Sequence, residues 1–185
     1  MTEMLGIAFV CTGNRFRSPL AAHLLARETN GESIRIASLG TLDLGPLPAL
    51  PEAVEMADEL GVDLSDHRAR SIEKADLGSA DLVIGFERAH IAAAVVDGDA
   101  DAARTFTLPQ LVALLGAIPS RPLGTEVAER ARVRIRQANE ARPPDWRTQP
   151  LAEIPDPLGA PRAVQRETAE ELNVLIRTLA HRLLG

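Results

Sequence analysis

The residues best suited to chemistry lie together near the start of the chain. Cys11, the only cysteine, is followed by Arg17 after a spacer of five residues. A loop that closes on a helix N-terminus directs several main-chain N–H groups at one point, with the positive end of the helix dipole behind them. Such a loop binds a tetrahedral oxyanion and holds a cysteine as the nucleophilic thiolate. An arginine at its end offers a planar fork of donors to two phosphate oxygens. The spacing therefore predicts a catalytic phosphate-binding loop.

The elements on either side of this stretch fit such a loop. The apolar run 5–10 predicts a strand leading into it, and the Ala- and Leu-rich run 20–26 predicts a helix leading out. Ser18-Pro19 is a typical helix start, and Gly13 and Asn14 can take a positive φ. The same residues also fit a buried apolar cysteine before an ordinary helix, because a Cys-x5-Arg pattern arises by chance in many chains. The placement between a strand and a capped helix favours the phosphate-binding interpretation.

Strands and helices alternate along the rest of the chain. Hydrophobic patterns predict strands at 33–37, 80–85 and 104–107, and helices at 18–29, 51–60, 87–96, 109–115 and 163–184. This order predicts an α/β fold, a doubly wound parallel sheet with its ligand at the C-terminal ends of the strands. Without internal repeats or low-complexity linkers, residues 1–185 are expected to form one domain.

Residues 116–150 differ in character from the rest. A charged, arginine-rich helix is expected over 124–142, and Pro143-Pro144 breaks it before Trp146. The stretch is interpreted as an insertion, a surface helix and loop near the rim of the active site. A solvated arm without a function is the alternative.

Composition excludes several classes of function. The 185 residues carry a net charge of −6, which argues against a nucleic-acid-binding surface. One cysteine forbids an intrachain disulfide, and a reactive thiol suits a reducing cytoplasm. The N-terminus has no signal-peptide pattern, and no apolar run approaches the length of a membrane span. No cluster has metal-ligand spacing. We therefore expect a cytoplasmic protein without a cofactor, metal, nucleic-acid or membrane partner, and its oligomeric state stays open.

The stretch from Cys11 to Pro19, with three later stretches, resembles the low-molecular-weight protein tyrosine phosphatase family. The resemblance implies a flavodoxin-like fold with a four-stranded parallel sheet flanked by helices. It also implies a cysteinyl-phosphate intermediate and a phosphorylated protein or small phosphomonoester as substrate. Cys11 and Arg17 are then catalytic, and phosphate is bound by the loop residues Thr12, Gly13, Asn14, Arg15, Phe16, Arg17 and Ser18.

A second stretch, 154–159, resembles the Asp-Pro loop that carries the general acid of this family. Asp156 would protonate the leaving oxygen and then activate water, and the prolines on either side stiffen the loop. The alternative for this sequence is a turn at the entry to a helix, where Asp-Pro is common.

The remaining matches concern the support of the loop. In the family, the loop asparagine hydrogen-bonds a serine and a histidine, and Asn14, Ser38 and His67 match these three positions. Ser18 matches the serine that donates to the thiolate. Asp81 and Glu87 are interpreted as residues that support the fold and take no part in the chemistry.

The chain departs from the family where the substrate would be held. Leucines and glycine stand beside the acid and after the second strand, where the family usually has aromatic residues, and the chain has no tyrosine. A ring of the substrate must then contact aliphatic side chains, or Phe16, Phe86 or Trp146. Arg15 stands where many members have an aliphatic residue and phosphoarginine phosphatases a threonine, so it favours an acidic substrate and disfavours a guanidinium. Phe16 replaces a second cysteine, which removes disulfide protection of the nucleophile.

Three other functions stay open at this point. A phosphoarginine phosphatase uses the same loop, and so does an arsenate reductase, which here would need an external thiol because the chain has no further cysteine. A phosphate- or phosphoprotein-binding module without turnover needs neither nucleophile nor acid, so Cys11 and Asp156 argue against it. A Rossmann-type nucleotide domain is disfavoured because the first turn lacks G-x-G-x-x-G.

Overall fold

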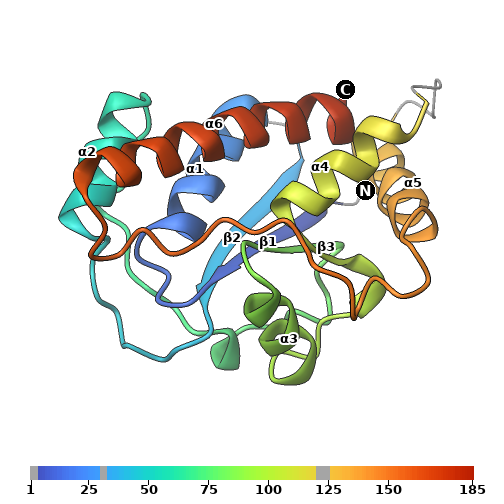
Figure 1. The fold of residues 1–185 in the computed structure, drawn as a ribbon, viewed down its shortest axis with the longest axis horizontal. Coiled ribbons are helices and arrows are strands. Elements are labelled where there is room, and N and C mark those ends of the chain that lie inside the picture. The colour runs from blue at the N-terminus through green and yellow to red at the C-terminus, as the bar shows by residue number, and fades with distance from the viewer. Residues whose placement is uncertain (1–3, 30–32, 120–125) are drawn as a thin grey trace.

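A computed structural model describes residues 4–29, 33–119 and 126–185 (Figure 1). Its sheet has four parallel strands in the order β2-β1-β3-β4, so the predicted doubly wound fold is confirmed. The strands are β1 Leu5–Cys11, β2 Ile34–Gly40, β3 Leu82–Gly85 and β4 Thr105–Thr107. The second strand runs three residues beyond the predicted 33–37, because it stays paired with β1 until Gly40 lies opposite Cys11.

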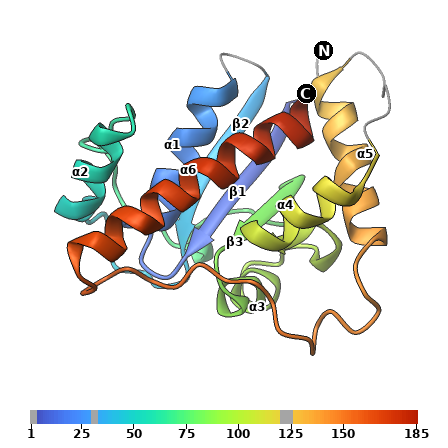
Figure 2. The same ribbon diagram turned by 45° about the horizontal axis from the view of Figure 1, so that its top comes forward.

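Helices cover both faces of the sheet. Figures 1 and 2 show α1, α4 and α6 on one face and α3 on the other. The helices are α1 Arg17–Thr29, α2 Pro51–Glu59, α3 Arg88–Val96, α4 Leu108–Ala117, α5 Val127–Glu140 and α6 Arg162–Leu184, and the 3-10 turns are η1 Ile72–Lys74 and η2 Ala102–Arg104. Each helix in the predicted list forms within a few residues of its expected bounds.

Alternation along β1 divides the core in two. Leu5, Ile7 and Phe9 are fully or almost fully buried in the larger cluster, with α1 and α6. Ala8 and Val10 point to the opposite face and join a smaller cluster with α3. Burial of each large side chain contributes about 1.5–3 kcal/mol, so the larger cluster fixes the end of β1 from which the loop departs.

Helix α5 packs one of its sides into the core, a contact that the expectation of a surface helix within 116–150 did not include. Its small residues and Ile135 are buried in the main core, in contact with α6. The expected start at Gly124 lies outside the described residues. The break after α5 is built around Arg142, whose guanidinium carbon lies 3.6 Å from the ring centre of Phe106 and 4.2 Å from that of Trp146. The alternation of charge along α5 concealed a helix that is packed on one side.

Candidate active site

The loop between β1 and α1 is shaped to bind an anion. Its carbonyls are held from outside: Cys11 O accepts from Thr41 N (2.9 Å), Thr12 O from Leu42 N (3.0 Å) and Arg15 O from Leu50 N (2.9 Å). Within the described parts of the chain, the main-chain N–H groups of residues 13–16 donate to no acceptor. With the carbonyls tied outward and α1 beginning at Arg17, these free donors form a concave anion site at a helix N-terminus.

The end of β2 passes very close to this loop. A Cβ added at Gly40 would lie 3.0 Å from Thr12 O and 3.1 Å from Asn14 N, both main-chain atoms that cannot move aside. Gly40 N in turn donates to Arg70 O at 2.7 Å. The absence of a side chain at this position is therefore required by the approach of the two backbones.

Asn14 holds the loop in its strained shape. It is fully buried and has φ 52°, in the left-handed region. Its Nδ2 donates to Ser18 Oγ (2.8 Å), its Oδ1 accepts from Arg70 N (2.9 Å), and its main-chain O accepts from His67 Nε2 (2.7 Å). Burial lowers the pKa of His67 below its usual range, so the ring acts as a neutral donor near pH 7.

The serine partner expected for Asn14 is different in the structure. Ser38 lies within β2, paired with Phe9, and no hydrogen bond joins its side chain to Asn14 in the described part of the chain. Ser18 accepts from the Asn14 side chain in place of Ser38, whereas the predicted pairing of His67 with Asn14 is present through the Asn14 main-chain O. The main-chain N–H of Arg70 is an additional partner of Asn14.

Ser18 lies beside the sulfur. Its Oγ is 3.0 Å from Cys11 Sγ and 3.2 Å from Leu39 O, and it already accepts from Asn14. The single hydroxyl proton can therefore go either to the carbonyl or to the sulfur. A thiolate, being charged, is the stronger acceptor, so Ser18 is placed to stabilise Sγ in its nucleophilic form.

Arg17 is buried under the loop, and the two terminal nitrogens of its guanidinium have different contacts. Nη1 donates to a Glu87 carboxylate oxygen and to Ile154 O (2.8 Å). Nη2 lies 2.8 Å from Asp156 Oδ2, but its N–H bonds are not aimed at that oxygen. It has no hydrogen-bond partner in the described part of the chain. A buried guanidinium nitrogen that makes no hydrogen bond at the edge of an anion site is suited to a phosphate oxygen.

The loop that carries Asp156 folds back over the nucleophile. Ile154 N donates to Phe86 O (2.9 Å), beyond the end of β3, and Ile154 O accepts from Arg17. Asp156 Oδ1 accepts from Leu158 N (3.1 Å), which orients the carboxylate. The side chain is 39% exposed, so Asp156 can reach both a bound substrate and water.

The family model for low molecular weight phosphotyrosine protein phosphatase matches residues 6–116. The chain belongs to this family. The resemblance read from the sequence is thereby confirmed. The matched region ends before Asp156, so the position of Asp156 beside Cys11 rests on the structure.

Individual relatives include more than one kind of enzyme. A probable low molecular weight protein-tyrosine-phosphatase EpsP of Ralstonia solanacearum is 40% identical over 78 residues, 42% of this chain and 52% of that protein. The match thus spans about half the length of the first curated relatives. A protein-arginine-phosphatase of Geobacillus stearothermophilus is 28% identical over 177 residues, 96% of this chain and 95% of that protein. The structure of a low molecular weight protein tyrosine phosphatase from T. tengcongensis aligns with a TM-score of 0.70 and 30% identity, covering 97% of this chain and 99% of that one.

His90 and Glu87 contact residues of this loop, although sequence reasoning did not assign them to the site. Glu87 pairs with Arg17 at the start of α3. The His90 ring is buried: its Nδ1 accepts from Phe86 N (3.2 Å) and Glu87 N (3.1 Å), which leaves Nε2 to donate to Thr12 Oγ1 (3.1 Å). In the sequence, the spacing Glu87-x-x-His90 is typical of a helix cap. Only the fold shows that this cap lies beside the loop.

The buried His90 makes stability depend on pH. Burial, and next the positive charge of Arg17, lower its pKa from 6.5 to about 4. Between these values the unfolded chain binds more protons than the folded one, so the free energy of unfolding falls as pH falls from 6.5 towards 4. Urea unfolding at about pH 7.5 and about pH 5 should show that His90→Gln removes about 2 kcal/mol of the wild-type loss. The exposed His181→Gln is the control, and an unchanged pH dependence in His90→Gln would contradict the assignment.

The wall of the site is aliphatic. A cavity of about 130 Å³ opens above Cys11 and Arg17 and is bounded by Leu42, Leu44, Leu50 and Leu158 together with Phe16. Leu158 is 65% exposed and Leu42 51%, so the mouth of the cavity is apolar. Phe86 is instead buried below Arg17, and Trp146 packs on Arg142. Of the aromatic residues considered from the sequence, only Phe16 lines the cavity.

Neither a metal-binding cluster nor a membrane-spanning helix is found among the described residues. No group of three or more His, Cys, Asp or Glu side chains there is arranged to hold a metal ion. None of the helices in those ranges combines the length and apolar character needed to cross a membrane.

Proposed function

We propose that this chain is a cysteine-dependent phosphomonoesterase of the protein tyrosine phosphatase type. The observation that carries the proposal is the convergence on one cavity of Cys11 Sγ, the free amides of residues 13–16, Arg17 Nη2, which makes no hydrogen bond, and the Asp156 carboxylate beside it. A module that only binds phosphate would need the amides and the arginine but neither the sulfur nor the carboxylate. The lone reactive thiol is best suited to a reducing compartment such as the cytoplasm.

The first step is attack of the thiolate on phosphorus. A bond forms between Sγ and phosphorus while the bond from phosphorus to the ester oxygen breaks, and Asp156 gives its proton to that oxygen. The amides and Arg17 hold the three other oxygens as charge spreads over them. The substrate oxygens displace Asp156 from Nη2, which frees the carboxyl to face the leaving group.

The second step returns the enzyme to its starting state. Asp156, now a carboxylate, takes a proton from a water molecule whose oxygen attacks the cysteinyl phosphate. The bond between sulfur and phosphorus breaks and inorganic phosphate leaves. Ser18, 3.0 Å from Sγ, donates to the sulfur as it regains its negative charge.

Trapping the intermediate tests this proposal directly. The wild-type protein with p-nitrophenyl phosphate, in the presence of a metal chelator, should release nitrophenolate. After an acid quench, the peptide that contains Cys11 should carry one phosphoryl group by mass spectrometry. Binding of phosphate without any release of nitrophenolate would identify a binding module. Release of nitrophenolate with phosphate on another residue would contradict the assigned nucleophile.

The proposal extends to a phosphotyrosine side chain as substrate. The apolar wall of Leu42, Leu44 and Leu158 can contact both faces of a ring, and Arg15 lies in the cavity lining with its Nε donating to Pro48 O (2.8 Å). That bond leaves the rest of the guanidinium at the mouth, where its positive charge attracts acidic groups and repels a guanidinium.

Replacing Arg15 should therefore shift the preference between substrates. In Arg15→Thr, the ratio of kcat/KM for a phosphoarginine peptide to that for a phosphotyrosine peptide should rise about tenfold, since a repulsion worth about 1.4 kcal/mol is removed. Steady-state assays of both peptides measure the ratio. Arg68→Thr, outside the cavity lining, should leave it unchanged. An equal ratio in wild type and Arg15→Thr would show that Arg15 does not discriminate between the two substrates.

A further inference from the structure

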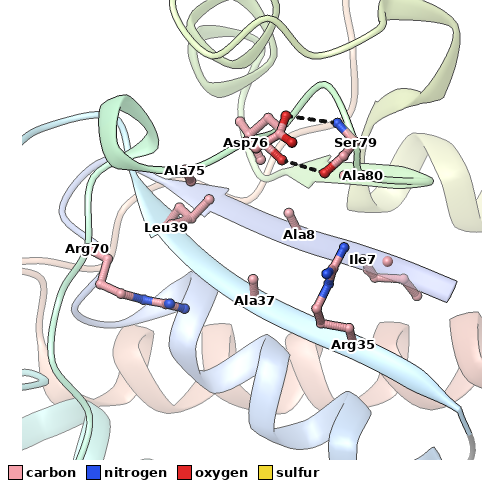
Figure 3. Close-up of a pocket in the computed structure, with 12 residues that line it drawn as sticks. Ile7, Ala8, Arg35, Ala37, Leu39, Arg70, Ala75, Asp76, Ser79 and Ala80 are labelled. Atoms are coloured by element: carbon pink, nitrogen blue, oxygen red, sulfur yellow. Dashed lines mark hydrogen bonds between the residues drawn. The ribbon is translucent and has the colours of Figure 1, made fainter. Parts of the chain in front are cut away.

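A second and larger cavity lies on the reverse face of the sheet. It has a volume of about 290 Å³ and is lined by β1, β2 and the segment 75–80 (Figure 3). Side chains that point to this face from β1 and β2 include Ala8, Ala37 and Leu39. The cavity exists because this part of the sheet has a loop over it in place of a helix and because its floor is built of small residues.

The lining combines an apolar floor with two positive charges. Arg35 comes from β2 and Arg70 from the loop that follows α2, and Figure 3 shows Ala37 between their guanidinium groups. Neither guanidinium takes part in any hydrogen bond or ion pair found among the described residues. Asp76 is the one acidic residue of the lining, and its Oδ1 already accepts from Ser79 N (3.1 Å). The charge balance of the cavity therefore favours an anion.

The chemistry of the walls narrows the class of anion. The main-chain N–H groups of β1 and β2 lie along the plane of the sheet, where they pair in the ladder or, at Gly6, donate to Asp81 Oδ2 (2.8 Å), so this face presents no nest of amides for a phosphate. Recognition is left to the two guanidinium forks, which match a planar carboxylate, and to the flat floor of methyl groups, which matches a planar apolar body.

The cavity is also connected to the catalytic loop. The residue that supplies one of the two charges, Arg70, donates its main-chain N–H to Asn14 Oδ1 (2.9 Å) and accepts from Gly40 N (2.7 Å). A neighbouring cavity of about 260 Å³ shares Leu39, Arg70 and Ala75 and reaches Asp43 and Gly45. These two residues flank Leu44 of the active-site wall. A ligand that fixes Arg70 thus acts on the residues that hold Asn14 in its left-handed conformation.

We propose that this reverse-face cavity binds a small carboxylate with a planar apolar body, held by Arg35 and Arg70, and that its occupancy changes the conformation of the phosphate-binding loop. The two sites are joined by one hydrogen bond, from Arg70 N to the side-chain Oδ1 of Asn14. The coupling is reciprocal, so phosphate in the loop alters the affinity of the second site. Binding at this site does not depend on the chain being a phosphatase.

A titration with benzoate, followed by amide NMR signals of the full-length protein, tests the proposal. Saturable shifts are expected at residues 35–39 and 75–80, together with the side-chain amide of Asn14. The double variant Arg35→Gln, Arg70→Gln should weaken binding at least about tenfold. Ala37→Leu, which fills the floor and keeps both charges, should weaken it to a similar degree. Arg68→Gln, a nearby exposed arginine outside the lining, is the matched control.

Each of the following results would contradict a stated part of the proposal. Shifts confined to residues 11–18 would mean that benzoate binds only at the phosphate loop and would overturn the proposal. So would an affinity that changes less than about twofold in both the double variant and Ala37→Leu. Shifts at the cavity without movement of the Asn14 side chain would overturn the coupling. Circular dichroism of each variant checks that the protein is folded, so that a loss of binding is not caused by unfolding.

Discussion

The Cys11→Ser variant is expected to hydrolyse p-nitrophenyl phosphate at least about 10³-fold more slowly than wild type while still binding inorganic phosphate. A serine hydroxyl in this position keeps its proton near neutral pH, and the loop supplies hydrogen-bond donors but no base to remove it. The donors that hold phosphate, namely the amides of 13–16 and Arg17, are untouched by the change. Steady-state kinetics and a calorimetric phosphate titration measure the two effects separately.

Thr178→Ala provides a matched change of one hydroxyl outside the linings of both cavities. The Thr178 side chain donates to Val174 O within α6 (2.9 Å), and the hydrolysis rate of this variant should equal that of wild type. Hydrolysis by Cys11→Ser at a rate near that of wild type would exclude a cysteinyl-phosphate mechanism. Loss of both hydrolysis and phosphate binding would instead mean that the sulfur is needed for the shape of the loop.

The Asp156→Asn variant is expected to lower kcat for phenyl phosphate by about 10² or more. The amide can still accept from Leu158 N, so the loop should keep its conformation, but it has no proton to give. The loss should be smaller with p-nitrophenyl phosphate, because nitrophenolate leaves readily without a proton. This dependence on the leaving group separates a general acid from a residue that only shapes the cavity.

Phosphate affinity gives a second, independent readout for the same variant. Asp156 Oδ2 lies 2.8 Å from Arg17 Nη2, and neutralising it removes a competitor for that nitrogen. Phosphate should therefore bind as tightly as in wild type or more tightly. Asp145→Asn, on the exposed segment before the acid loop, is the control. An equal loss of kcat with both substrates would argue that Asp156 is not the proton donor.

Sequence analysis predicted the parts of the site that depend on short patterns of neighbouring residues. The apolar run before Cys11, the Ser18-Pro19 helix start and the fixed spacing to Arg17 are all visible within fifteen residues, and each lies where expected. The match of Asp156 to the acid loop needed the family resemblance, since nothing local ties that residue to Cys11. The fold brings the two together because the C-terminal ends of β1 and β3 share one edge of the sheet.

The missed parts depend on contacts between distant elements. The serine that bonds the Asn14 side chain is Ser18 and not the predicted Ser38, and a further partner is the main-chain N–H of Arg70, which no side-chain pattern indicates. In the sequence, His90 looks like an ordinary residue of an Ala-rich helix. Its contact with Thr12 follows only from the pairing of β1 with β3. The buried side of α5 was not predicted because alanines form most of it. Alanines occur on exposed as well as buried sides of a charged helix, so they gave no indication of burial.

The guanidinium of Arg17 divides structure and chemistry between its two terminal nitrogens. Nη1 is engaged with Glu87 and with the main chain at Ile154, whereas Nη2 makes no hydrogen bond. In the proposed mechanism, one rigid planar group therefore sets the distance between the bound phosphate and the loop that carries Asp156. Substrate recognition and the alignment of Asp156 would then not vary independently, and a change that weakens one would displace the other.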